Sequence, residues 1–188
     1  MIEHFTTKKL LTDSECDSII EYSLKNLNLK PGLIGNDALD EKNRKSDVSF
    51  TNYDLEFPFL KTKLLNEISN KIIVKGYDIN FENQPFQFTR YSVGEFYNWH
   101  TDSSFSGPFS DRYCSVVIQL NDTYSGGDLQ MRKTPNDELI TFENGKGNLF
   151  VFLSNILHRV TEVTNGTRYS LVSWFTLKPN QSFKKTLI

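Results

Sequence analysis

The chain has 188 residues, which is enough for a single domain with a sizeable hydrophobic core. Lysines and arginines number 21 against 23 aspartates and glutamates, so the chain lacks the basic excess typical of a protein that binds nucleic acid. No apolar run approaches the length of a membrane span, and the first residues lack the basic and apolar regions of a signal peptide. The two cysteines, Cys16 and Cys114, form neither a disulfide framework nor a C-x-x-C zinc site, so we expect a cytoplasmic protein.

Two amphipathic helices are predicted in the first half of the chain. The sequence TDSE at residues 12–15 is a capping box, and the apolar residues that follow recur at helical spacing to Leu27. A helix is therefore expected over about residues 13–27. The apolar residues between Phe57 and Ile73 predict a second helix, whose first turn accommodates a proline. We expect both helices to pack on one face of a sheet.

The segment between the helices, residues 29–50, is predicted to be irregular. Its Pro-Gly pair at 31–32, its Gly-Asn pair at 35–36 and the dense mixed charge of residues 40–45 are typical of loops. Two interpretations stay open, a solvated loop and a lid beside a site. The start of the chain around His4 is expected to be frayed.

From about residue 77 the hydrophobic period changes to two, which predicts β-strands, with a further loop at 103–111. Helices followed by many short strands argue against an alternating α/β fold and favour a sandwich or jelly roll. We predict an α+β protein that is mainly β and forms one domain over residues 1–188. Its helical support spans about 1–75 and its jelly-roll core about 77–177. The predicted strands cover 86–91, 113–120, 129–132, 138–142, 148–153, 158–163 and 168–177.

The first candidate site is the pair His100 and Asp102. In extended backbone, residues two apart point to the same side, so this imidazole and carboxylate can hold one ion. His158, just past the apolar run at 149–153, is the candidate third ligand. Two histidines and one carboxylate form the facial triad that suits non-haem Fe(II) with open positions. Taken alone, the pair is also explained by a strand-end histidine bonded to a nearby carboxylate.

Arg168 lies ten residues beyond His158, across a turn at residues 165–166. A metal that oxidises its substrate with O₂ needs an electron source, and a 2-oxoacid bound at the iron is one solution. The far carboxylate of that acid needs a buried cation, and the planar guanidinium of arginine pairs a carboxylate in two places. Taken alone, Arg168 is better explained as a surface arginine on a strand.

Three motifs extend this pattern into a family resemblance. They read Y-x-x-G-x-x-Y-x-x-H-x-D from Tyr91 to Asp102, G-G-D-L at 126–129, and H-x-V-x-x-V-x-x-G-x-R from His158 to Arg168. Together they resemble the prolyl 4-hydroxylase-like branch of the Fe(II)/2-oxoglutarate dioxygenases, which includes the PKHD-type hydroxylases. The resemblance runs from about residue 85 to 176, with weaker similarity at residues 44–46.

The resemblance implies a double-stranded β-helix, which is a jelly roll. It also implies an enzyme that hydroxylates a prolyl residue of a peptide or protein with O₂ and Fe(II), while 2-oxoglutarate is decarboxylated to succinate. Ascorbate is a candidate further cofactor. Gln119 stands where the family often has tyrosine. The implied roles are Fe(II) binding by His100, Asp102 and His158, binding of the distal 2-oxoglutarate carboxylate by Arg168, the co-substrate pocket for Tyr91 and Gln119, and the substrate side for Tyr97, Trp174 and Arg44.

Three other functions stay open at this point. A hydroxylase of this kind can act on a free amino acid or another small molecule. A non-catalytic jelly-roll binding module would keep the fold, although the intact ligand set and Arg168 argue against it. A zinc hydrolase would use the same ligands with Glu95 or Asp111 as its general base, and it does not explain Arg168. No feature of the sequence indicates the oligomeric state.

A geometric condition follows if His158 and Arg168 both face the interior. A two-residue Asn-Gly hairpin loop would put Arg168 on the face opposite His158. We therefore predict a three-residue loop or a bulge near 164–167 that pairs Thr164 with Arg168. The same parity turns inward the alternate residues Ser170, Val172 and Trp174.

Overall fold

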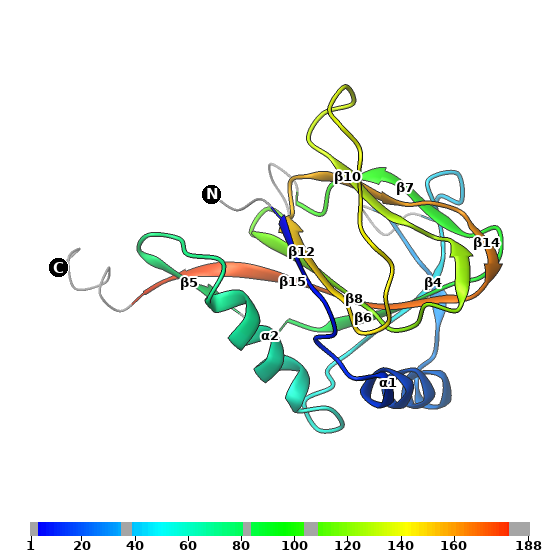
Figure 1. Ribbon diagram of the computed structural model, residues 1–188, viewed down its shortest axis with the longest axis horizontal. Helices are drawn as coiled ribbons and strands as arrows, with labels where there is room; N and C mark the ends of the chain where they lie inside the picture. Colours follow the sequence, from blue (N-terminus) through cyan, green and yellow to red (C-terminus); the bar gives the residue numbers. More distant parts are fainter. Residues whose placement is uncertain (1–3, 35–38, 81–83, 104–108, 181–188) are drawn as a thin grey trace.

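Two β-sheets face each other, and two helices cover the outer face of the larger sheet (Figure 1). The computed structural model describes residues 4–34, 39–80, 84–103 and 109–180. No helix within those ranges is long and apolar enough to cross a membrane. In chain order the elements are β1 (His4–Thr7), α1 (Asp13–Asn26), β2 (Lys30–Pro31), β3 (Arg44–Lys45), β4 (Asp47–Thr51), α2 (Phe59–Ser69), β5 (Tyr77–Asn80), β6 (Phe86–Tyr91), β7 (Phe96–His100), β8 (Cys114–Gln119), β9 (Tyr124–Gly126), β10 (Leu129–Arg132), β11 (Ile140–Thr141), β12 (Leu149–Leu153), β13 (Leu157–Val160), β14 (Val163–Gly166) and β15 (Arg168–Pro179).

The larger sheet, here the major sheet, has the strand order β1-β12-β8-β15-β6-β4-β2, with β5 added to β15. The minor sheet has the order β11-β10-β13-β7-β3, and β14 pairs with β9 as a separate ribbon. The strand β15 pairs with β6 on one side and with β8 on the other, so it lies inside the major sheet. The mainly β jelly-roll fold predicted from the sequence, with both helices on one sheet, is confirmed.

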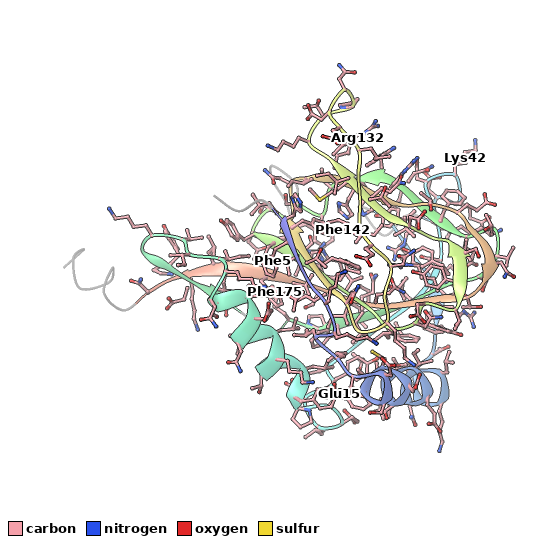
Figure 2. The ribbon with its side chains drawn as sticks, viewed as in Figure 1. Phe5, Glu15, Lys42, Arg132, Phe142 and Phe175 are labelled. Atoms are coloured by element: carbon pink, nitrogen blue, oxygen red, sulfur yellow. The ribbon has the colours of Figure 1, made fainter. Side chains whose placement is uncertain are left out.

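The core consists of two apolar layers, one on each face of the major sheet. Successive residues of a strand point to opposite faces. In β12, Val151 therefore joins the layer between the sheet and the helices, while Phe150 joins the layer between the two sheets. Phe175 belongs to the first layer and Phe142 to the second (Figure 2). Because the helices pack on the outside of the major sheet, its inner face is available to line a cavity.

The first helix begins and ends close to its predicted limits, and the second is shorter than predicted. The capping box is present, since Thr12 Oγ1 accepts from the Glu15 amide at 3.2 Å and the Glu15 carboxylate accepts from the Thr12 amide at 2.8 Å. The helix α2 ends at Ser69, and Ile73, which was expected on its apolar face, is 83% exposed. Ile73 is therefore not part of the packing face of α2.

Two predictions for the first 50 residues were wrong. The segment 29–50, expected to be irregular, contains the strands β2, β3 and β4, which extend the edges of both sheets. His4, expected to be frayed, lies in β1 opposite Phe152. Edge strands are stabilised by hydrogen bonds to a distant neighbour, so the local sequence gives little sign of them. Residues 35–38 and 104–108 of the two predicted loops lie outside the described residues.

The chain between His158 and Arg168 does not form the predicted hairpin. The strand β13, which carries His158, lies in the minor sheet, and β15, which begins at Arg168, lies in the major sheet. The strand β14 between them pairs with β9, and its register shifts between residues 163 and 165. Arg168 is the partner of Tyr91 on β6, and the predicted pairing with Thr164 was wrong. The two side chains face one cavity because their sheets face each other.

Gly147 joins the segment before α1 to the major sheet. Its φ is +82°, and a Cβ at this position would lie 2.1 Å from the carbonyl oxygen of Leu11. We expect Gly147→Ala to lower the free energy of unfolding by more than the ~1–3 kcal/mol of left-handed backbone strain alone, as measured by urea denaturation. Gly94→Ala is the matched control, because Gly94 has the same φ but no atom within 4 Å of its Cβ position. Equal losses in both variants would contradict a role for the Leu11 contact.

Candidate active site

A cavity of about 620 Å³ lies between the two sheets. Its wall from the minor sheet carries His100 and His158, and its opposite wall is formed by β15 of the major sheet. The prediction that alternate residues of β15 point inward is confirmed, because every second residue at the start of this strand lines the cavity. These residues are Arg168, Ser170, Val172 and Trp174.

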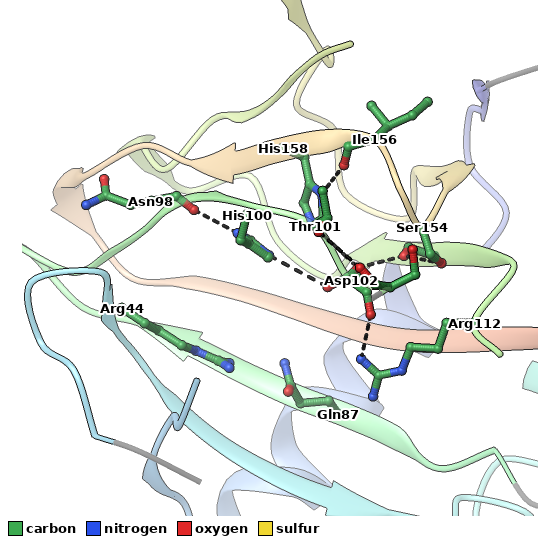
Figure 3. Close-up of polar contacts among 12 residues, drawn as sticks. Arg44, Gln87, Asn98, His100, Thr101, Asp102, Arg112, Ser154, Ile156 and His158 are labelled. Carbon is green, nitrogen blue, oxygen red and sulfur yellow. Dashed lines mark hydrogen bonds and ion pairs between the residues drawn. The ribbon is translucent and has the colours of Figure 1, made fainter. Parts of the chain in front are cut away.

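His100, Asp102 and His158 offer three ligand atoms that all lie within 4.8 Å of one another. His100 ends β7 and is the Cα partner of His158 on β13, so two neighbouring strands bring the rings together. Asp102 follows β7 directly. Its Oδ1 lies 3.7 Å from His100 Nε2, and its Oδ2 lies 3.4 Å from His158 Nε2. The three side chains converge on one point of the cavity wall (Figure 3).

Main-chain carbonyl groups orient both imidazole rings. His100 Nδ1 lies 2.7 Å from the carbonyl oxygen of Asn98, and His158 Nδ1 lies 3.0 Å from that of Ile156. Because a carbonyl oxygen only accepts, each Nδ1 carries the N–H group, and the neutral ring has its lone pair on Nε2. This tautomer binds a metal through Nε2 while the carbonyl fixes the plane of the ring.

The three groups shift one another's pKa values. Burial lowers the pKa of His100 to about 3. Burial also disfavours the charged form of His158, but the ion pair and hydrogen bond with Asp102 outweigh it and raise the pKa of His158. Burial alone would raise the pKa of Asp102, and the charge and hydrogen bond of His158 together with Ser115 lower it instead. The ionised carboxylate is the form that binds a metal ion.

Asp102 is held by a serine that the sequence analysis did not single out. Ser115 Oγ donates to Asp102 Oδ2 at 2.6 Å and lies 2.9 Å from Ser154 Oγ. The carbonyl oxygen of Ser154 also accepts from the main-chain N–H group of Asp102 at 2.8 Å. Ser115 lies in the fully buried strand β8. A polar residue inside an apolar strand is the signal that could have revealed it.

We expect Ser115→Ala to weaken metal binding by about 10- to 100-fold, because a ligand that loses its supporting hydrogen bond is less well oriented. The measurement is anaerobic titration of the apoprotein with Fe(II). Ser173→Ala is the matched control, since Ser173 is also buried but donates to the carbonyl oxygen of Pro85. An unchanged Fe(II) affinity in Ser115→Ala would show that Asp102 is positioned without this bond.

Arg168 is a buried cation without an acidic partner among the described residues. Its side chain is 1% exposed, and its Nη1 donates to Ser170 Oγ at 3.1 Å. Its Nε and Nη2 atoms are also buried and have no hydrogen-bond partner within the described part of the chain. A buried charge is costly unless it is paired. The two unpartnered nitrogens therefore indicate a place for an anionic ligand.

Of the other two residues expected in the co-substrate pocket, Tyr91 lines the cavity and Gln119 is not among its lining residues. The Tyr91 ring lies 5.4 Å from the guanidinium carbon of Arg168, and burial raises the pKa of Tyr91, so its hydroxyl keeps its proton. Gln119 Nε2 donates to the carbonyl oxygens of Asn121 and Tyr169 at 2.9 and 3.0 Å. In this arrangement Gln119 has no N–H group left to donate to a co-substrate.

All three residues expected on the substrate side line the cavity. Tyr97 stacks on His100 with ring centroids 3.5 Å apart, and the guanidinium carbon of Arg44 lies 4.6 Å from the Tyr97 centroid. Trp174 stacks on the guanidinium of Arg112, whose carbon lies 3.9 Å from the ring. The sequence analysis did not single out Arg112, because nothing in its local sequence distinguishes it from a surface arginine.

These residues fit an Fe(II) ion and a bound 2-oxoacid. Two imidazole nitrogens and one carboxylate form the donor set of non-haem Fe(II) sites with open positions. The unpartnered nitrogens of Arg168 face the same cavity from the other sheet. A dicarboxylate that extends from the metal position to Arg168 would give this buried cation its missing partner.

Comparison with known proteins agrees with this geometry. Residues 86–176 match the sequence profile of the 2OG-Fe(II) oxygenase superfamily. A PKHD-type hydroxylase of Rippkaea orientalis is 34% identical over 91 residues, which cover 46% of this chain and 40% of that protein. One of Prochlorococcus marinus is 28% identical over 146 residues, covering 77% of this chain and 62% of that protein. The chain thus spans about half the length of the curated relatives that it matches.

Solved structures share the fold at low sequence identity. A prolyl-4-hydroxylase of Pseudomonas putida has a TM-score of 0.70 at 21% identity and covers 93% of this chain and 92% of that one. A prolyl hydroxylase from Trichoplax adhaerens, in complex with a hypoxia inducible factor peptide fragment, has a TM-score of 0.77 at 17% identity. The match covers 93% of this chain and 83% of that one. With the His-Asp-His triad in place, residues 86–176 match the 2OG-Fe(II) oxygenase superfamily, and the chain is similar to the PKHD-type branch of that superfamily.

Proposed function

We propose that the protein is an Fe(II)- and 2-oxoglutarate-dependent dioxygenase that hydroxylates a prolyl residue of a peptide or protein. One observation carries this proposal: the His-Asp-His triad lies on one wall of a cavity, and the opposite wall carries the buried Arg168, which has no acidic partner among the described residues. The reaction is balanced when one substrate C–H bond, O₂ and 2-oxoglutarate give the C–OH product, succinate and CO₂.

The protein's own residues bind and orient the reactants in this proposal. His100, Asp102 and His158 hold Fe(II), which supplies the site for O₂ activation when it is bound. Arg168 pairs with the distal carboxylate of 2-oxoglutarate through the two nitrogens that have no partner among the described residues, and the Tyr91 ring lines the same part of the cavity. The two facing sheets exclude bulk water from these groups.

The prolyl substrate is supported by the relatives and by the shape of the cavity. The Pseudomonas putida and Trichoplax adhaerens structures are prolyl hydroxylases by name, and the second is in complex with a peptide fragment. In this chain Tyr97 and Trp174 give aromatic walls near the triad, which suit the apolar ring of proline. We further propose that the described residues act as a single catalytic domain. A role for ascorbate and a cytoplasmic location stay predictions from the sequence.

The test is succinate formation by the purified protein with Fe(II), 2-oxoglutarate and O₂, with and without proline-containing peptides. We expect succinate to rise with a peptide that gains one oxygen atom in its mass spectrum. Succinate formation that no peptide stimulates would support the dioxygenase reaction and contradict the proposed prolyl substrate. An iron-loaded protein that forms no succinate would overturn the proposal in favour of a binding module.

The zinc hydrolase is the weaker alternative because its general base is missing from the cavity. Neither Glu95 nor Asp111 is among the described residues that line the cavity. The Glu95 carboxylate instead accepts from the main-chain N–H group of Ser92 at 2.8 Å, and Asp111 is exposed. A metal-bound water would therefore lack the neighbouring base that hydrolysis requires.

A further inference from the structure

The cavity carries more positive charge than Fe(II) and 2-oxoglutarate account for. The cations among its described lining residues are Lys30, Arg44, Arg112 and Arg168, and the one acid among them is Asp102. In the loaded site, the two charges of Fe(II) and the charge of Arg168 balance Asp102 and the two carboxylates of 2-oxoglutarate. Lys30 is exposed to solvent, so Arg44 and Arg112 are the two cations that no acidic residue of the described cavity lining then balances.

Arg44 is 94% buried, since its exposed fraction is 6%. Its Nε donates to Ser46 Oγ at 2.9 Å, and its Nη1 donates to the carbonyl oxygen of Leu33 at 3.0 Å. Its Nη2 is buried and has no hydrogen-bond partner within the described ranges. The guanidinium lies over Tyr97, which itself stacks on His100, so Arg44 is one aromatic ring away from a metal ligand.

Arg112 approaches the same space from the other side. Its guanidinium lies between two aromatic rings, 3.9 Å from the centroid of Trp174 and 4.2 Å from that of Phe109. Its Nη1 donates to the main-chain carbonyl oxygen of Asp102 at 3.3 Å. Figure 3 shows Arg44 and Arg112 pointing toward each other below the triad, with the Gln87 side chain between them.

Two fixed guanidinium groups beside a hydrophobic wall form a carboxylate-binding arrangement. Hydrogen bonds and stacking already orient both groups, so little side-chain freedom is lost when an anion binds. The planar guanidinium offers parallel N–H donors that match a carboxylate. The low dielectric of the cavity strengthens such a pair and disfavours two uncompensated cations.

We propose that the substrate carries a carboxylate, which Arg44 and Arg112 hold while the carbon to be hydroxylated faces His100 and Asp102. This inference rests on the proposed function and narrows its substrate class to an acidic compound. The carboxylate can belong to a C-terminal proline or to an acidic side chain next to an internal proline. Both sources present the same chemistry to the two arginines, and the experiment separates them.

Two matched pairs of probes test the inference. The first is a blocked dipeptide that ends in proline, as the free acid and as the amide. The second is a blocked tetrapeptide in which an internal proline precedes glutamate or glutamine. Binding to the anaerobic protein with Fe(II) and 2-oxoglutarate is measured by calorimetry, and succinate formation in air is measured separately. We expect the acid of at least one pair to bind about 10- to 100-fold more tightly than its neutral partner.

The ratio of the affinity for the acid to the affinity for its neutral partner is then measured in variants. Arg112→Gln is expected to bring the ratio near unity, and Arg112→Lys to retain part of it. Arg132→Gln is the matched control, because Arg132 also stacks on a tryptophan, Trp99, but does not line the cavity (Figure 2). This affinity ratio is measured first in the unaltered protein, where it tests the inference even if a variant does not fold.

Equal binding of acid and neutral probes in both pairs, or no binding of either acid, overturns the inference. Succinate formed under those conditions leaves the proposed function intact, so the two failures are distinguishable. Absence of any 2-oxoglutarate turnover by the iron-loaded protein overturns both.

Discussion

Replacement of His158 with alanine is expected to abolish Fe(II) binding at the triad and, with it, succinate formation. The variant retains only His100 and Asp102, which are two of the three ligands. Loss of a residue that hydrogen-bonds a metal ligand lowers the metal affinity by about 10- to 100-fold, so loss of the ligand itself should lower it by more than 100-fold. The measurements are anaerobic Fe(II) titration and succinate formation at saturating 2-oxoglutarate.

His4→Ala is the matched control for this variant. His4 is a histidine on the edge strand β1, where its ring packs edge-on against Phe142, and it is not part of the triad. We expect His4→Ala to bind Fe(II) as the unaltered protein does. Stoichiometric Fe(II) binding by His158→Ala would show that the ion is held elsewhere and would remove the basis of the proposed function.

Replacement of Arg168 with methionine is expected to raise the KM for 2-oxoglutarate by about 100-fold or more. The two unpartnered nitrogens of Arg168 would each lose a hydrogen bond to a carboxylate, and a charged bond is worth about 1.5–3 kcal/mol. The Fe(II) affinity measured without 2-oxoglutarate should stay within a few-fold of the original, because Arg168 is not a metal ligand. The measurement is succinate formation as a function of the 2-oxoglutarate concentration.

Two further variants separate binding of the co-substrate from a structural role. Arg168→Lys keeps the charge but loses the planar fork, so its KM should lie between those of the unaltered protein and Arg168→Met. Arg90→Met removes an arginine from the neighbouring strand β6, where Arg90 pairs with Asp47, and should leave the KM unchanged. A KM that is also unchanged in Arg168→Met would show that 2-oxoglutarate does not pair with Arg168.

Much of the fold follows from patterns that are local in the chain. The capping box and the helical spacing located α1, and period-two alternation located β6 at its observed limits. Regions whose structure depends on a distant partner were missed. The segment 29–50 becomes three strands only because β4 pairs with β6 and β3 pairs with β7, and no local pattern encodes such edge pairing.

The relation between His158 and Arg168 illustrates the same limit. Their spacing in the motif was sufficient to propose that both face one site, and the structure brings both to the same cavity. The proposed route through a hairpin was wrong, because the chain passes from the minor to the major sheet and β14 pairs with β9 on the way. A local turn does not determine whether the strands on either side of it pair with each other.

Side chains that support the site were the hardest to predict. Ser115 contacts Asp102 across 13 positions of sequence, and Arg112, which precedes β8, meets Trp174 of β15 only because both segments adjoin the same cavity. Gln119 was assigned to the co-substrate pocket from its place in a motif, but its amide donates to two main-chain carbonyl groups. A motif fixes the position of a residue in the chain, whereas packing decides which atoms remain available for a ligand.

The most direct test of the central claim is an anaerobic titration of the apoprotein, first with Fe(II) and then with 2-oxoglutarate, followed by visible absorption. We expect one equivalent of Fe(II) to bind, and a weak charge-transfer band to develop as 2-oxoglutarate is added. The band should be absent in His158→Ala and should need a much higher 2-oxoglutarate concentration in Arg168→Met. Bound iron with no band at any 2-oxoglutarate concentration would contradict the claim that the triad and Arg168 together form a site for Fe(II) and 2-oxoglutarate.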